Sequence, residues 1–244
     1  MAAHRAGTSP LVRARVAGAL YLVANLFAPF TLLYLPSRFI VRGDAAATAN
    51  SIMASESLFR VGIVGNLFTF IANILLALAL YQLLKVVNKN MASLMVILFL
   101  VGVPIAMLNE VTQLAVLRLL SGADYLNTYA TDQLQALAYL LLGLHDQGLL
   151  IAHIFFGLWL LPMGYLVFKS GFIPKIVGVL LVIAGVGYVV QSFAAFLGYN
   201  VDIILFTGLG ELVFLLWLLI RGVNVEQWKK RVLESARPND EKKF

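Results

Sequence analysis

Long apolar stretches alternate with short polar segments along this chain of 244 residues. A helix needs about 20 mostly apolar residues to cross the hydrocarbon core of a bilayer. Several stretches reach or approach that length, so we predict a polytopic, all-α membrane protein with six transmembrane helices. The predicted spans are Val16–Leu35, Val61–Val86, Met91–Leu120, Gly148–Phe168, Ile176–Leu197 and Ile203–Ile220.

Two further segments have a helical pattern but are too short to span. Asp44 is a suitable N-cap for an Ala-rich run that leads into the second span. Thr131 or Asp132 can cap a run whose leucines recur at helical spacing as far as Leu144. We predict two short surface helices on the extracytoplasmic side. In the alternative, the second joins the fourth span as one long helix bent near Gly148.

The composition supports membrane burial, and the basic residues predict the orientation. The chain is 61% hydrophobic and 12% charged, whereas soluble domains contain about 45–50% apolar and roughly 25% charged residues. Most of the 18 Lys and Arg residues lie before the first span or after the second, fourth and sixth, while Arg38 and Arg42 lie on the opposite side. Because cytoplasmic loops are enriched in Lys and Arg, we expect a multi-pass protein of the cell membrane with both termini cytoplasmic.

These features divide the chain into a cytoplasmic tail over residues 1–15, a transmembrane domain over 16–220 and a basic cytoplasmic tail over 221–244. In the last tail Val225, Trp228 and Val232 share one helical face beside three basic residues. Such a helix can lie on anionic lipid, although it also fits a simple topology signal with an aromatic anchor. No basic patch is interleaved with aromatics, so nucleic acid is not an expected partner.

Polar and ionisable side chains occur inside the apolar stretches. Glu110 carries the sharpest signal, because a carboxylate in a bilayer costs roughly 2.5–3.5 kcal/mol on insertion scales. Three explanations are open: Glu110 is neutral and hydrogen-bonded, for example to Asn109, it is part of a functional site, or the span is misplaced. These polar side chains are predicted to lie between the bilayer centre and the outer surface. Their clustering at this depth suggests an outward-facing polar cavity. Its candidate ligand-binding residues are Asn66, Asn73, Glu110, Gln113, His153, Gln191 and Glu211.

The sequence contains no clear motif for catalysis or metal binding. The chain contains no cysteine, no HExxH pair, no P-loop and no GxSxG elbow. His145 and His153 are eight residues apart, about 12 Å along one helix, so they cannot chelate one metal together. We therefore assign no catalytic residue, metal or cofactor. Gly178, Gly185 and Ser192 form a stripe of small residues that allows close helix packing.

Three segments resemble a bacterial and archaeal family grouped as a domain of unknown function, the DUF4386 type. They are GDAAATANSIMASESLFRVG from Gly43, LSGADYLNTYATDQLQAL from Leu120, and the stretch from Phe155 to Phe193, which is the most specific. The resemblance covers the chain from the first span to the sixth. It implies an integral membrane protein with about six helices, and it supplies no activity or substrate.

Three functions fit these observations. The preferred one is a non-enzymatic membrane protein that binds or moves a small molecule or lipid through the outer polar cavity. The second is an intramembrane enzyme acting on lipid, with Glu110 or His153 as acid or base and a metal as an option. In the third, a structural or assembly protein, the polar residues only join helices.

Overall fold

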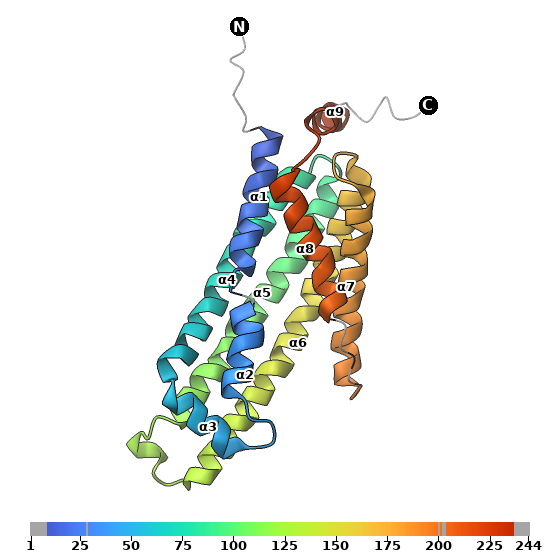
Figure 1. Ribbon diagram of the computed structural model, residues 1–244. Coiled ribbons are helices and arrows are strands. Elements are labelled where there is room, and N and C mark those ends of the chain that lie inside the picture. The colour runs from blue at the N-terminus through green and yellow to red at the C-terminus, as the bar shows by residue number, and fades with distance from the viewer. Residues whose placement is uncertain (1–8, 28, 200, 202–203, 237–244) are drawn as a thin grey trace. The chain divides into compact units, whose positions relative to one another are not determined.

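Helices make up the regular structure of the chain. The computed structural model describes residues 9–27, 29–199, 201 and 204–236, and these contain no strand (Figure 1). The helices are α1 (Pro10–Asn25), η1 (Phe30–Tyr34), α2 (Leu35–Phe39), α3 (Ala45–Ala54), α4 (Glu56–Leu84), α5 (Lys89–Leu119), η2 (Asp124–Leu126), α6 (Thr131–Ser170), α7 (Lys175–Phe196), α8 (Ile204–Ile220) and α9 (Val225–Ala236). The predicted all-α class is confirmed.

Four of the described helices, α4 to α7, are long and apolar enough to cross a membrane. A fifth is counted only if α8 and α9 form one span, although their axes differ by 101°. The helix α1 has 16 residues and α8 has 17, which corresponds to about 24–26 Å against a hydrocarbon core of about 30 Å. The structure thus supports four or five of the six predicted spans.

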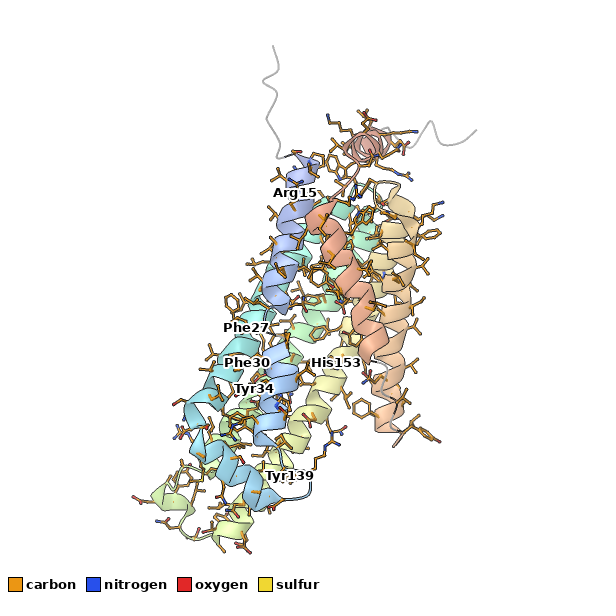
Figure 2. All side chains as sticks on the ribbon, viewed as in Figure 1. Arg15, Phe27, Phe30, Tyr34, Tyr139 and His153 are labelled. Carbon is orange, nitrogen blue, oxygen red and sulfur yellow. The ribbon has the colours of Figure 1, made fainter. Side chains whose placement is uncertain are left out.

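The first apolar stretch is not one helix, contrary to the prediction of a span over Val16–Leu35. The helix α1 begins earlier and ends at Asn25, and the chain continues through the π-helical η1 into α2. Pro29 precedes η1, and it has no N–H to bond the carbonyl of Asn25 four residues back. Phe30 and Tyr34, labelled in Figure 2, stack across η1 with ring centroids 5.6 Å apart.

Of the two predicted surface helices, the first forms and the second does not exist as a separate helix. Asp44 caps α3 by accepting a hydrogen bond from the backbone N–H of Ala47 at 2.8 Å. The segment after Thr131 instead runs without interruption into the fourth span as the 40-residue helix α6. The alternative of one fused helix is therefore correct. Gly148 does not end this helix, because a single glycine weakens a helix without breaking it.

The chain divides into two compact units. Of the described residues, the first unit comprises those within 1–22, 74–100 and 153–244, and the second comprises those within 23–73 and 101–152. The second unit has an apolar core formed by Leu35, Phe39, Ile52, Phe59, Ile63, Val116, Leu117 and Ala138. Within the first unit α7 and α8 pack side by side (Figure 1).

Glycines bring the end of α6 against α7 in the first unit. A Cβ on Gly178 would lie 2.7 Å from the carbonyl oxygen of Gly164, and a Cβ on Gly185 would lie 2.6 Å from that of Gly157. No side chain fits at such distances, so the two backbones touch only because glycine stands at these positions. The predicted stripe of small residues is confirmed for Gly178 and Gly185, and Ser192 on the same stripe is fully buried.

The helix α9 lies across the end of α8 and is anchored to the ends of two other helices (Figure 1). The indole Nε1 of Trp228 donates to the carbonyl of Leu83 at 3.1 Å. The guanidinium of Arg231 donates to the carbonyls of Lys169 at 2.8 Å and Ser170 at 3.2 Å. The last carbonyls of a helix have no partner within it, so α9 satisfies the ends of α4 and α6. Its predicted apolar face therefore contacts protein at Trp228.

Substituting Gly178 by alanine should destabilise the packing of α6 against α7. The new Cβ would lie 2.6 Å from the backbone nitrogen of Phe168, and overpacking of this kind costs about 1–3 kcal/mol. We expect Gly178→Ala to lower the thermal midpoint in detergent, followed by circular dichroism. Gly143→Ala is the control, because a Cβ there meets no described atom within 4 Å. An unchanged midpoint for Gly178→Ala would contradict the proposed backbone contact.

Candidate functional site

The second unit contains a polar cluster centred on His145, which is buried. Gln113 approaches the ring from one side, with its Nε2 2.8 Å from Nε2 of the histidine. On the other side Nδ1 lies 3.3 Å from the carbonyl oxygen of Asn109. Nδ1 also lies 3.1 Å from Nδ2 of Asn109 and 3.2 Å from Oγ1 of Thr112. Because an amide nitrogen only donates, Nε2 of the ring accepts the hydrogen bond from Gln113. The ring thereby links α5 to α6.

Asn109 fits into this cluster because α6 has a glycine opposite it. Its amide Nδ2 donates to the carbonyl of His145 at 2.7 Å. A Cβ on Gly148 would lie 2.1 Å from the side-chain oxygen of Asn109, so no larger residue leaves room for this amide. Thr112 completes the cluster by donating to the carbonyl of Asn109 at 2.6 Å. Gly148 thus serves the close approach of a polar side chain.

Glu110 lies on α5 next to this cluster and has only half of its hydrogen-bonding capacity used. The residue is 2% exposed. Its Oε1 accepts a hydrogen bond from Nδ2 of Asn66 on α4 at 3.1 Å. Its Oε2 is buried and has no hydrogen-bond partner among the described residues. Because an unpaired buried polar atom is costly, this oxygen requires its own proton or a partner from outside the described chain.

A second carboxyl, Glu211, belongs to the first unit and is fully paired. Its Oε2 accepts a hydrogen bond from the hydroxyl of Tyr21 on α1, and its Oε1 accepts one from Tyr188 on α7 at 3.0 Å. A Cβ on the neighbouring Gly210 would lie 2.6 Å from the carbonyl oxygen of Leu180. Glycine at 210 therefore lets α8 approach α7 closely. The three side chains join α1, α7 and α8.

The remaining predicted residues lie in different surroundings. His153, labelled on α6 in Figure 2, has its ring centroid 5.7 Å from that of Tyr188 and 6.1 Å from that of Phe156. Gln191 on α7 has a buried Oε1 without a partner among the described residues. Asn73 donates to the carbonyl of Thr69 one turn earlier in α4. His153 thus packs on the tyrosine that bonds Glu211, whereas the contact of Asn73 stays within one helix.

The predicted set thus falls into two groups. Asn66, Asn73, Glu110 and Gln113 belong to the second unit, and His153, Gln191 and Glu211 belong to the first. Within the groups the structure pairs Asn66 with Glu110. No cluster of three or more His, Asp or Glu side chains that could hold a metal occurs in the described ranges.

Sequence reasoning missed four participants in these contacts: Tyr21, Thr112, His145 and Tyr188. His145 was overlooked as a site residue because the fourth span was predicted to begin at Gly148. The helical spacing of Asn109 and Gln113 on α5 was the one signal that pointed to it. The two tyrosines had no signal, since aromatic residues are ordinary in apolar spans.

Comparisons with known proteins identify the family. The family described as "Domain of unknown function (DUF4386)" matches residues 16–222. The chain is 36% identical over 161 residues to an uncharacterized protein of Archaeoglobus fulgidus, a match that covers 66% of this chain and 83% of that protein. No solved structure matches the chain. The chain therefore belongs to the DUF4386 family, as its resemblance suggested.

Replacing His145 by phenylalanine should destabilise the protein more than the same change at His153. The first substitution leaves the half-buried amide of Gln113 without its partner, and a fully buried polar group left unpaired costs about 1–3 kcal/mol. His153 makes ring contacts and no hydrogen bond to a described residue, so phenylalanine preserves most of its packing. Thermal unfolding of both variants in the same detergent tests this. Equal midpoints would contradict a structural role for the His145 cluster.

Proposed function

We propose that this member of the DUF4386 family is a multi-pass membrane protein that binds a small molecule or lipid at Glu110. The observation that supports the proposal is the buried Oε2 of Glu110, which has no partner among the described residues. Ionisable residues inside membranes are costly and are commonly functional. A carboxyl that served only to join helices would be expected to use both oxygens, as Glu211 does.

The Oε2 atom of Glu110, which has no described partner, also suggests the chemistry of the ligand. Oε2 is an acceptor when Glu110 is ionised, so a ligand with an N–H or O–H group would satisfy it. Asn66 holds the other oxygen and fixes the orientation of the carboxyl. An amine or a hydroxyl of a lipid or small molecule meets this requirement. The candidate residues Asn73 and Gln113 belong to the same unit as Glu110 and stay in the proposed polar lining.

The proposal retains six membrane crossings and cytoplasmic termini. Besides α4 to α7, the crossings are α8 and the interrupted segment from α1 through η1 to α2. Broken helices are tolerated in membranes where the freed backbone groups are buried in protein or face water. The basic side chains of α9 would face anionic lipid, because its Lys229 and Lys230 are exposed.

The polar residues of the first unit favour a structural role within this protein. Glu211 has a donor on each oxygen, and the three helices that it joins are held by these bonds. An enzymatic role has less support, since among the described residues Glu110 bonds only the amide of Asn66, which supplies no second acid or base. Binding at Glu110 is therefore proposed ahead of catalysis.

Native mass spectrometry of the gently purified protein tests the ligand. We expect a stoichiometric additional mass that is lost in Glu110→Gln, since a neutral amide replaces the charged acceptor. Glu56→Gln is the matched control, because Glu56 is exposed and pairs with Arg60 at the surface. A mass that persists in Glu110→Gln, or a bare protein in several mild detergents, would overturn the proposal.

Single cysteines test the orientation, because the chain contains none of its own. Ser121 follows α5 and Ser235 lies in α9, and both side chains are exposed. We expect an impermeant maleimide to label Ser121→Cys in intact cells, and to label Ser235→Cys only after the cells are lysed. The reverse pattern would place both termini outside and refute the predicted topology.

A further inference from the structure

A second candidate site lies in the first unit, whereas the proposed ligand position belongs to the second. A pocket of about 400 Å³ opens between the turn from α6 to α7 and the turn from α8 to α9. Its lining residues are Gly171, Phe172, Ile173, Pro174, Trp217, Arg221, Gly222, Val223 and Asn224. None of these residues was selected by the sequence as a ligand-binding position.

The two turns are fixed against each other, so the pocket has defined walls. The backbone N–H of Asn224 donates to the carbonyl of Phe172 at 3.0 Å. Gly171 and Gly222 stand where φ is +75° and +67°, values that glycine adopts without strain. Arg231 of α9 adds its hydrogen bonds to the end of α6. The pocket is therefore built by the fold.

The lining carries positive charge that is not neutralised. Arg221 is exposed and makes no ion pair among the described residues, whose salt bridges join Arg60 to Glu56 and Arg231 to Glu234. No acidic residue lines the pocket. Lys169 and Lys175 flank the first turn and are also exposed. This end of the unit thus attracts anions, and a guanidinium binds phosphate oxygens through two parallel N–H groups.

Part of the pocket lining is apolar. Phe172, Ile173 and Val223 are buried side chains that line the pocket. Trp217 lines it as well, and its buried Nε1 has no acceptor among the described residues. A site with a cation at its rim and aromatic and aliphatic walls suits a molecule that is both anionic and apolar. Free phosphate would use only the first of these features.

We propose that this pocket binds the phosphate group of a phospholipid, with Arg221 as its anion-binding residue. The location agrees with that chemistry, because the pocket lies where the apolar helix α8 ends and the basic α9 begins. Tryptophan and arginine are typical of this depth, at the level of the lipid headgroups. The proposal is independent of a ligand at Glu110.

The experiment uses the full chain purified in a neutral detergent. Native mass spectrometry would measure binding of dihexanoyl-phosphatidylglycerol, and dihexanoylglycerol would serve as the probe without phosphate. Equilibrium dialysis with radioactive inorganic phosphate would measure binding of the anion without the lipid. We expect one phosphatidylglycerol per chain, no retention of dihexanoylglycerol, and binding of inorganic phosphate at least ten times weaker than that of the lipid.

Three substitutions identify the residue responsible. Arg221→Gln should weaken phosphatidylglycerol binding at least tenfold, whereas Arg221→Lys should retain part of it because the charge remains. Arg15→Gln is the matched control, since Arg15 is an exposed arginine on α1 outside the pocket (Figure 2). Thermal unfolding confirms that each variant is folded.

The outcomes separate the sources of the anion and the two proposals. Inorganic phosphate that binds as tightly as the lipid, and is lost in Arg221→Gln, would overturn the lipid assignment in favour of a soluble phosphate. Equal losses in Arg221→Gln and Arg15→Gln would show nonspecific charge attraction and refute the site. Glu110→Gln should leave phosphatidylglycerol binding unchanged, so failure of one proposal does not decide the other.

Discussion

The need to satisfy buried polar groups governs this structure. A backbone carbonyl or side-chain amide that is buried away from water must find its partner inside the protein. The ends of α4 and α6 show how this is achieved, since Trp228 and Arg231 donate to carbonyls that their own helices leave unpaired. The cluster around His145 follows the same rule for side chains. Polar residues in the apolar stretches are thus largely explained as connections between helices.

The same constraint explains why glycines stand at particular positions. A hydrogen bond or a backbone contact between two helices requires a short distance, and a side chain in the way prevents it. Gly148 leaves room for Asn109, and Gly210 lets α8 come near α7 beside Glu211. Gly164 and Gly178 let the backbones of α6 and α7 touch. Small residues and polar residues therefore work together, because packing alone joins membrane helices only weakly unless they approach closely.

Much of the fold was predictable from the sequence because hydropathy and caps act locally. The positions of α4, α5 and α7 follow from apolar length, and α3 follows from Asp44 at its start. The break after Asn25 was not predicted, and the fusion that makes α6 long was predicted only as an alternative. Both depend on a balance between one residue, Pro29 or Gly148, and the packing of the surrounding chain, which hydropathy does not report. The sites were less predictable still, since Tyr21 and Tyr188 gain their role only from where α1 and α7 place them.

Glu110 and Glu211 illustrate what the structure adds to a list of intramembrane carboxyls. By residue type and hydropathy they are equivalent, and both would be costly to insert into hydrocarbon. The structure gives Glu211 a hydroxyl donor for each oxygen, whereas Glu110 has one amide donor and one oxygen without a described partner. The free energy that pairing recovers for Glu211 is only partly recovered for Glu110. The difference must be supplied by a proton or by a bound molecule, and this requirement places the search for function at Glu110.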